Sequence, residues 1–378
     1  MQNKIKRIGI FIESLSEMGG AERAALLIAK YLNDSGFDLN IIVIDDGNSF
    51  YEAPKGCKII GLNLNKKSNN YFEGLINNIK RISIIKSSIS DLKLESLISF
   101  TTKPNVLAII SCIGTPTKCI INQQSPSLIS MKYLTQSKVR TLIWVLLSKI
   151  FYRYADNLVC VSKYISDSIN WVNDNDKKII YNPLPNTSFE SGLEPEIKLP
   201  KGYKYIVGMG RIIKQKGFDL LINSFSLIEK NNPELRLVII GDGSQLNNLK
   251  DYSHSLGLAD KIIFHGSITN PFSVLIQCHI FVLPSRWEAF GNVIIEAMSL
   301  GLPTVCFDIH GGPQEIIQNR VNGILIEYCN IEEMANTLND LIINKKLYKD
   351  ISSKSLLVKD QFSVDKIGVK WEKLLKSN

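Results

Sequence analysis

Residues 284–303 read PSRWEAFGNVIIEAMSLGLP and decide the fold that we expect for this chain. The five residues before them, HIFVL, are apolar and partly β-branched, as in a buried strand. Apolar residues then recur at positions 293, 294, 297, 298 and 300, which is the spacing of one helix face. The segment therefore predicts a strand, a loop and a helix, with Gly291 and Asn292 at the helix start.

The predicted helix start is suited to an anionic ligand. The first amide groups of a helix lack partners within it and lie at the positive end of its dipole, so they bind phosphate well. Glu296 stands one turn into the helix, and Glu288 stands in the loop before it. Both carboxylates can therefore reach a ligand that carries a phosphate and several hydroxyl groups. The alternative is that Glu288 is an ordinary loop acid and Glu296 a solvated helix residue.

Length and composition favour a two-domain protein. The chain has 378 residues, of which 45% are hydrophobic and 21% charged, so it can bury two cores of ordinary size. Its 7 cysteines are scattered and never spaced as CxxC, which argues against a disulfide framework or a structural zinc site. No apolar run approaches the roughly 18 residues of a spanning helix, and no signal-peptide cleavage site follows the first residues. We therefore expect a cytoplasmic protein.

Charge is concentrated in the first half of the chain. The formal net charge is +8, and residues 51–154 carry 15 basic but only 4 acidic side chains. This excess implies an anionic partner for that region. An anionic membrane is the expected one. Nucleic acid is not expected, because basic and aromatic residues are not interleaved as in a single-strand groove. The alternative is a solvated basic surface.

The first 182 residues alternate between predicted strands and helices. Strands are expected at residues 5–12, 39–44, 58–61, 97–100, 119–122 and 157–161. The first strand is followed by a loop that ends in Gly19 and Gly20 and then by a helix over 21–32, which is the opening unit of a doubly wound sheet. The loop lacks G-x-G-x-x-G, so a dinucleotide site is not expected. Its glycines allow close approach to a substrate, although a plain tight turn explains them as well.

Residues 131–154 predict a basic amphipathic helix. Leu, Ile, Trp and Phe are interleaved there with Lys138, Arg140, Lys149 and Arg153. Such a helix can lie in a membrane interface, but the same pattern serves a helix that packs on the sheet.

A second α/β domain begins after a boundary. Residues 183–203 are rich in proline and lack periodicity, which predicts an interdomain linker. Strands are then expected at 205–209, 235–240, 261–264 and 279–283, with helices at 217–230, 244–256 and 293–300 in a domain of residues 204–363. A last helix, within 364–378, is expected to cross back to the first domain. The predicted fold class is therefore α/β, with two doubly wound, Rossmann-like domains that face each other across a cleft.

Three further sites follow strands of the second domain. Gly210 and Arg211 follow one strand and Lys216 comes five residues later, so both cations can converge on a diphosphate. A turn of Gly241, Asp242 and Gly243 follows the next strand and brings the backbone close to a ligand. His265 ends a third strand, where it can meet a nucleobase. The alternatives are surface charge, a simple turn and a structural histidine.

The segments GMGRIIKQKGFDLLI, IIGDGSQ, IIFHG and PSRWEAFGNVIIEAMSLGLPTVCFD, with MGGAER near the start, resemble the retaining family-4 glycosyltransferases of the two-domain GT-B fold. The resemblance covers essentially the whole chain and is strongest over residues 204–327.

The resemblance implies a role for each candidate residue. It implies that Arg211 and Lys216 hold the donor diphosphate, that Glu296 holds the ribose hydroxyls and that Glu288 contacts the donor sugar. The amides of Phe290, Gly291, Asn292 and Val293 would bind sugar or phosphate, and Gly19 and Gly20 would lie across the cleft near the phosphate and acceptor.

One departure from the family concerns acid–base chemistry. Many relatives carry a histidine in the first domain, whereas the 4 histidines of this chain all lie in the second. The matching segment is residues 121–126, INQQSP, whose amides can orient hydroxyls but cannot act as a base. Transfer would then depend on charge stabilisation of the leaving diphosphate, which could itself take the acceptor proton. No DxD-like pair is evident near the predicted donor loop, so no metal or other cofactor is expected.

We therefore expect a retaining glycosyltransferase that moves a sugar from a nucleotide donor, expected to be UDP-linked, to a lipid-linked or polysaccharide acceptor in bacterial surface-glycan synthesis. It would be cytoplasmic, with a peripheral contact to the inner face of the plasma membrane. Two alternatives stay open: a UDP-sugar 2-epimerase on the same architecture, and an inactive sugar-nucleotide-binding partner of an assembly complex.

Overall fold

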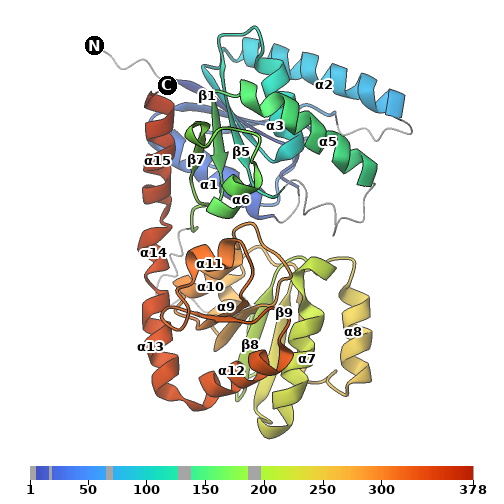
Figure 1. Cartoon of the computed structure of the whole chain (residues 1–378), viewed down its shortest axis with the longest axis vertical. Helices are drawn as coiled ribbons and strands as arrows, with labels where there is room; N and C mark the ends of the chain where they lie inside the picture. Colours follow the sequence, from blue (N-terminus) through green and yellow to red (C-terminus); the bar gives the residue numbers. More distant parts are fainter. Residues whose placement is uncertain (1–5, 17–18, 65–70, 127–137, 186–196, 378) are drawn as a thin grey trace. The chain divides into compact units, whose positions relative to one another are not determined.

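The computed structural model describes residues 6–16, 19–64, 71–126, 138–185 and 197–377 (Figure 1). The chain divides into two compact units, one of Met1–Pro183 with Val364–Asn378 and one of Leu184–Ser363. The sequence pattern placed a linker at 183–203, of which 186–196 lie outside the described residues. The end of that stretch packs on the second unit, because Gln277 accepts from the Leu199 amide at 3.0 Å and donates to the Ile197 carbonyl at 2.6 Å.

The first unit is built on a seven-stranded parallel sheet. Its strands are β1 (Arg7–Ile12), β2 (Asp38–Val43), β3 (Lys58–Gly61), β4 (Ser96–Phe100), β5 (Lys118–Gln123), β6 (Asn157–Cys160) and β7 (Lys177–Ile179). Its helices are α1 (Gly20–Asp34), α2 (Tyr71–Asp91), α3 (Thr102–Cys112), α5 (Lys138–Phe151), α6 (Lys163–Ser168) and α15 (Val364–Ser377). The strand order is β3-β2-β1-β4-β5-β6-β7.

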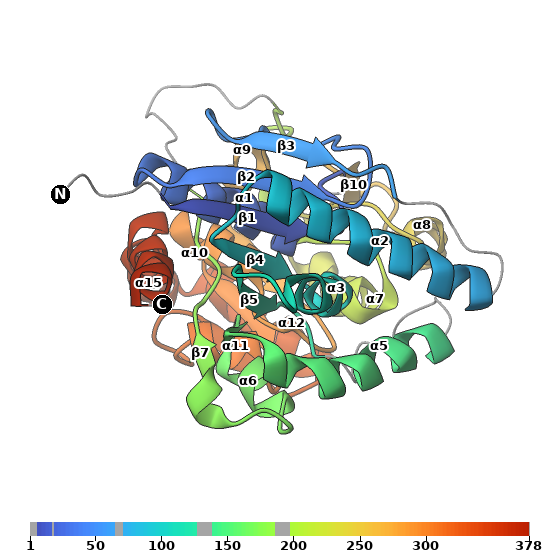
Figure 2. The same ribbon diagram turned by 90° about the horizontal axis from the view of Figure 1, so that it is seen from above.

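This order creates a switch point between β1 and β4. The chain runs outward from β1 to β3 and then returns to the other side of β1, so the connections after β1 and β4 leave on opposite faces of the sheet. Helices α1 and α15 cover one face, and α2, α3 and α5 lie on the other (Figure 2). In such sheets ligands bind at the carboxyl ends of the strands beside the switch point. The loop before Gly19 and the turn after β4 lie at this edge.

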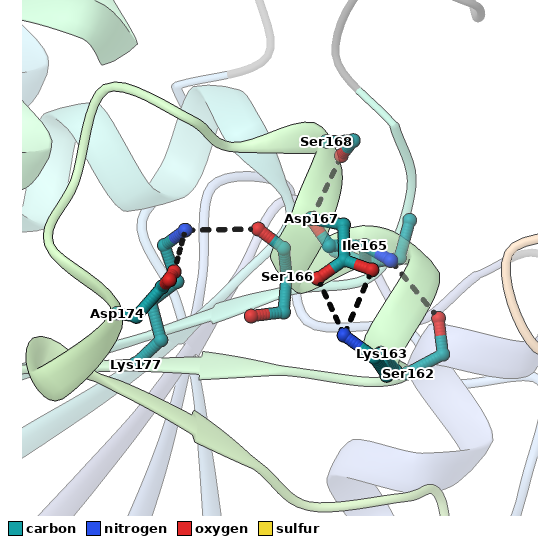
Figure 3. A network of polar contacts seen from close by, with 8 residues as sticks. All are labelled: Ser162, Lys163, Ile165, Ser166, Asp167, Ser168, Asp174 and Lys177. Atoms are coloured by element: carbon teal, nitrogen blue, oxygen red, sulfur yellow. Dashed lines mark hydrogen bonds and ion pairs between the residues drawn. The ribbon is translucent and has the colours of Figure 1, made fainter.

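The short edge strand β7 is held by a polar network around α6 (Figure 3). Ser162 caps α6 by accepting from the Ile165 amide at 3.2 Å. The buried ammonium of Lys177 in β7 donates to the Ser166 carbonyl at 3.0 Å and pairs with Asp174 at 2.9 Å. A buried cation is tolerated when it is paired and hydrogen-bonded. Lys177 therefore links β7 to α6 through a buried hydrogen bond.

The second unit repeats the architecture with six parallel strands. These are β8 (Lys204–Met209), β9 (Leu235–Ile240), β10 (Ile262–Gly266), β11 (Ile280–Leu283), β12 (Thr304–Phe307) and β13 (Ile324–Ile326). Its helices are α7 (Phe218–Ile228), α8 (Leu246–Ser255), α9 (Phe272–Leu275), α10 (Asn292–Ser299), α11 (Gly312–Ile316), α12 (Ile331–Ile343), α13 (Lys345–Ser355) and α14 (Val358–Gln361). The order β10-β9-β8-β11-β12-β13 places the switch point between β8 and β11.

The expectation of two parallel, doubly wound α/β units is confirmed. The observed helix α10 begins one residue before the predicted apolar face, and β10 extends two residues past the predicted strand. The strands β7, β12 and β13 were missed, because runs of three or four residues carry too little periodicity to separate them from loops. Of the predicted helix over 131–154, residues 131–137 lie outside the described part, and α5 with the 3₁₀ turn Tyr152–Tyr154 forms the rest.

Candidate functional site

Two loops meet at the switch point of the second sheet. Residues 210–217 follow β8 and residues 284–291 follow β11, and hydrogen bonds join them side by side. The Arg286 amide donates to the Gln215 carbonyl at 2.8 Å, and the Gln215 side chain donates to the Trp287 carbonyl at 3.0 Å. Gly217 has φ 68°, and a Cβ there would lie 1.9 Å from the Pro284 carbonyl oxygen, so only glycine allows this approach.

An ion pair joins the two loops at their centre. The Lys216 ammonium lies 2.5 Å from Oε1 of Glu288, and the Ser285 hydroxyl donates to the same oxygen at 2.7 Å. The Lys216 side chain is only 14% exposed and that of Glu288 only 8%. The structure therefore brings together two candidate residues that are 72 positions apart in the sequence. Ser285 was not a candidate, because nothing in the sequence marks a serine that will face a carboxylate.

A second ion pair fixes the outer side of the loops. Arg286 donates to both carboxylate oxygens of Asp219, at 2.9 and 2.8 Å, and to the Lys214 carbonyl at 2.7 Å. Burial alone would raise the pKa of Asp219, but hydrogen bonds from Arg286 and Lys214 lower it to about 2. Asp219 therefore stays charged at neutral pH and holds Arg286, whose planar fork suits a carboxylate. Sequence reasoning missed this pair, which positions the loop that carries Glu288.

The glycines after β8 and β9 bring their backbones into contact. Gly241 has φ 139°, and a Cβ there would lie 2.0 Å from the Gly210 carbonyl oxygen. The Ile212 amide donates to the Asp242 carbonyl at 2.7 Å, and the Gly243 amide donates to the Asp242 carboxylate at 2.6 Å. The predicted Gly241–Gly243 turn therefore lies against the Gly210 loop.

The two predicted cations differ in their surroundings. The aliphatic part of Lys216 runs past Gly210, since a Cβ on that glycine would lie 3.4 Å from Lys216 Cε. Arg211 is exposed, and among the residues that the structure describes its guanidinium has no hydrogen-bond or ion-pair partner. Lys216 is thus held in place by Glu288, whereas Arg211 is available to a ligand.

Helix α10 begins in this same loop region. Its N-cap is Gly291, Asn292 is its first residue, and Phe290 is buried. Glu296 lies in the second turn and is only 4% exposed, so it is not the solvated helix residue of the alternative interpretation. Val293 is half-buried. A buried glutamate one turn from a helix start requires polar partners.

His265 lies in β10, beyond the turn of Gly241. Its Nδ1 atom is buried and has no hydrogen-bond partner among the described residues. The neighbouring Gly266 accepts from the Gly241 amide at 2.8 Å, so the histidine is carried next to the Gly241–Gly243 turn. Because protein atoms cover this nitrogen, a ligand can reach it only if neighbouring groups move.

In the first unit, Gly19 caps α1 and Gly20 is the first helical residue. The side-chain amides of Gln123, the last residue of β5, and of Gln124 after it are largely used within the fold. Gln123 accepts from Tyr152 at 2.6 Å and donates to Thr102 at 2.9 Å. Gln124 and Asn182 exchange hydrogen bonds at 3.0 and 2.9 Å. Both glutamine side chains therefore bond to neighbouring residues of the fold. They would have to break some of these hydrogen bonds before both amides could bind substrate hydroxyls.

Sequence reasoning also missed Thr101, directly after β4. Its backbone has φ 72° and ψ 160°, a region that β-branched residues rarely adopt. Strained backbone of this kind gathers at functional sites, and Thr101 stands at the switch point of the first sheet. No signal in the sequence marks a threonine with this conformation.

Comparison with known proteins gives a consistent family assignment. A family model described as Glycosyl transferases group 1 matches residues 192–356. An uncharacterized glycosyltransferase of Haemophilus influenzae is 27% identical over 377 residues, covering 98% of this chain and 100% of the relative. The N-acetylgalactosamine-N,N'-diacetylbacillosaminyl-diphospho-undecaprenol 4-alpha-N-acetylgalactosaminyltransferase of Campylobacter jejuni is 28% identical, covering 93% and 94%.

Solved structures show the same fold over the full length. Alr3699/HepE of Anabaena in complex with UDP and glucose matches with a TM-score of 0.76 at 20% identity, covering 98% of this chain and 99% of that one. Sucrose-phosphate synthase of Thermosynechococcus elongatus matches with a TM-score of 0.82 at 16% identity, covering 98% of each chain. These similarities identify the two-sheet architecture as the GT-B fold.

Proposed function

Since this chain belongs to the glycosyl transferases group 1, the retaining family-4 glycosyltransferases of the GT-B fold, we propose that it transfers a hexose or N-acetylhexosamine from a UDP-linked donor to a lipid-linked acceptor. The observation that carries the proposal is the Lys216–Glu288 pair, buried at the switch point beside the start of α10. In a ligand that contains a diphosphate and a sugar, the diphosphate can accept from Lys216 and the sugar hydroxyls can donate to Glu288. The Campylobacter relative, whose name specifies an undecaprenol diphosphate acceptor, supports the lipid-linked class.

The mechanism follows from the charges at the donor site. Lys216 and Arg211 neutralise the diphosphate as the bond between sugar and phosphate breaks, which is the step at which negative charge develops. Glu288 holds the sugar hydroxyls, and Glu296 holds the ribose. The backbone of residues 290–293 and of the Gly241–Gly243 turn contacts phosphate or sugar, and His265 contacts the nucleoside. We propose these roles from the positions of the residues in the second unit. None of the roles requires a metal ion.

The acceptor proton has no histidine to receive it in the first unit. We propose that the departing phosphate takes this proton on the side from which it leaves, so that the acceptor oxygen attacks from that same face. Retention of configuration then needs no enzyme nucleophile. Gly19 and Gly20, at the switch point of the first sheet, provide close backbone approach for the acceptor.

The experiment that tests the proposed function is a transfer assay with purified protein. UDP-, GDP- and ADP-linked sugars are each incubated with a polyprenyl-diphosphate-linked sugar. The products are analysed by mass spectrometry for the added mass and by ¹H NMR for the configuration of the sugar. We expect one added hexose or N-acetylhexosamine from a UDP-linked donor, with the anomeric configuration of the donor retained. Conversion of UDP-N-acetylglucosamine without acceptor to its 2-epimer would instead support an epimerase. Donor binding without either product would support an inactive partner.

The proposed lipid-linked acceptor brings the first unit to a membrane, and α5 offers a surface for it. Its apolar residues Val139, Leu142, Ile143, Leu146 and Ile150 are between 40% and 53% exposed and recur on one helical stripe. Val145 is buried, so the helix also packs on its own unit. No described helix is both long and apolar enough to cross a bilayer. A basic helix with an exposed apolar stripe is suited to lie in the interface of an anionic membrane.

We therefore expect the protein to sediment with liposomes that contain anionic lipid at low salt. Each basic residue near such a surface contributes about 1 kcal/mol, and about 1 M salt shortens the Debye length to about 3 Å and should release the protein. Changing Lys138, Arg140 and Lys149 to Gln should weaken sedimentation. The matched control changes the exposed Lys345, Lys346 and Lys349 of α13 to Gln. No sedimentation at low salt, or equal loss in both triple variants, would contradict the membrane contact.

A further inference from the structure

The first unit contains a cavity of about 810 Å³ at the amino ends of its strands. Its walls come from the last turns of α2, the turns that lead into β4 and β5, and Leu375 of α15. Lys6 precedes β1, while Ser96 and Lys118 are the first residues of β4 and β5. The cavity therefore opens at the edge of the sheet opposite to Gly19 and Thr101. Its volume is within the roughly 300–1,000 Å³ of small-molecule sites.

Four lysines but only two acids line this cavity, which we call the amino-edge pocket. The lysines are Lys6, Lys86, Lys93 and Lys118, and the acids are Asp91 and Glu95. Among the residues that the structure describes, none of the four ammonium groups pairs with a carboxylate. Lys6 donates to the Leu375 carbonyl at 2.7 Å and Lys86 to the Ile113 carbonyl at 3.0 Å. An ammonium group has three donors, so each of these two lysines keeps two for a ligand.

The helix ends at this pocket do not cancel its positive charge. Both α2 and α3 end here, and free carbonyls at helix ends would attract a cation. Several of these carbonyls already have donors: Ile89 accepts from Leu94 at 3.1 Å, and Cys112 accepts from Thr115 at 3.0 Å. Ile113 accepts from Lys86 itself. Asp91 accepts from the Ser87 hydroxyl at 3.3 Å, and Asp91 and Glu95 are the only carboxylates in the described lining. The four lysines outnumber them, so the pocket favours an anion.

The size of the pocket favours an organic ligand over a bare anion. Ile89, Leu94 and Leu375 also line it, but each is at most 3% exposed, so these side chains offer a ligand little surface. A bare inorganic phosphate would fill only a part of the cavity of about 810 Å³. A phosphate that carries an organic group can occupy more of this space while its oxygens accept from the lysines.

We infer that the amino-edge pocket binds a small organic phosphate, whose phosphate group accepts from the lysines. This site lies in the first unit and shares no residue with the proposed donor site around Lys216 and Glu288. It therefore does not depend on the proposed function. The first unit would then bind two ligands: the acceptor near Gly19 and Gly20, as we propose, and the organic phosphate in the amino-edge pocket.

The test uses the full chain and 4-fluorophenyl phosphate, observed by ¹⁹F NMR. We expect its signal to broaden on addition of protein, whereas neutral 4-fluorobenzyl alcohol should not broaden. Changing both Lys86 and Lys118 to Gln should weaken binding at least about tenfold, since charge-assisted hydrogen bonds are lost. Ser90→Trp, which leaves the charge unchanged but fills the pocket from α2, should abolish binding.

Two controls test whether the broadening comes from the amino-edge pocket. Changing the exposed Lys55 and Lys58 to Gln removes the same charge from the same unit and should alter affinity by less than about twofold. Lys216→Ala should leave the ¹⁹F broadening unchanged. The inference is overturned if the wild-type signal does not broaden, if it broadens equally with the Ser90→Trp variant in its folded form, or if Lys216→Ala removes the broadening. The last result would place the phosphate in the second unit.

Discussion

Lys216→Ala should lower the turnover number about 100-fold or more, the scale for loss of one preorganised electrostatic contact in a transition state. Lys216 supplies the buried positive charge at the switch point of the second sheet, and its ammonium is held 2.5 Å from Glu288. Alanine removes the charge that faces the leaving diphosphate. The measurement is steady-state transfer with the UDP-linked donor found in the screen.

The neighbouring lysine is the matched control. Lys214 is 62% exposed and pairs with Asp219, which Arg286 also holds. Lys214→Ala should therefore change turnover by less than about threefold, because exposed ion pairs contribute little. Near-normal turnover of a folded Lys216→Ala variant would contradict the role of Lys216.

A stability effect must be separated from the catalytic one. Breaking a buried ion pair by removing one partner costs about 3–5 kcal/mol, since the other charge is left without compensation. The variant that combines Lys216→Ala with Glu288→Gln removes both charges. We expect it to recover part of the lost stability but none of the lost activity. Recovery of activity together with stability would mean that Lys216 acts only by holding the loop, and it would also contradict the proposed contact of Glu288 with the donor sugar.

The positions of the candidate residues could be predicted because they follow strands. In a parallel sheet the carboxyl ends of strands meet at one edge, so loops after successive strands converge there. The Gly210 loop, the Gly241 turn and the Glu288 loop each follow a strand of one sheet, and His265 lies near the end of another of its strands. The sequence pattern thus located the region of the site, whereas the roles of these residues stay predictions.

The contacts within the site could not be predicted in the same way. Periodicity assigns residues to strands and helices, but it does not say which loop side chains meet. Ser285 and the Arg286–Asp219 pair support Glu288 and its loop, and each requires a contact across the two loops. Thr101 is a similar case, because its backbone conformation is imposed by the fold around it and opposes its own preference. The side-chain amides at the end of β5 looked suited to hydroxyl binding, but those of Gln123 and Gln124 bond within the fold.

The helix α15 joins two distant parts of the chain in one core. It follows the second unit in the chain, yet Val364–Asn378 groups with the first unit (Figure 1). Trp371 is fully buried in the first core and stacks on Phe100 of β4 at 6.4 Å between ring centroids. The Tyr31 hydroxyl of α1 donates to Glu372 at 3.2 Å. The first unit therefore depends on residues made after the whole second unit.

Trp371→Ala should consequently destabilise the first unit by about 3–5 kcal/mol, the range for truncating a large buried aromatic side chain. The matched control is Lys373→Ala in the same helix, where the side chain is exposed and the cost should stay within about 0.5 kcal/mol. Because a two-domain chain need not unfold in one step, hydrogen exchange read by mass spectrometry suits the measurement better than a single melting curve. Protection should fall throughout residues 7–183 of the Trp371→Ala variant and stay unchanged over 204–363. Loss of protection confined to 204–363, or equal protection in both variants, would show that α15 does not support the first core.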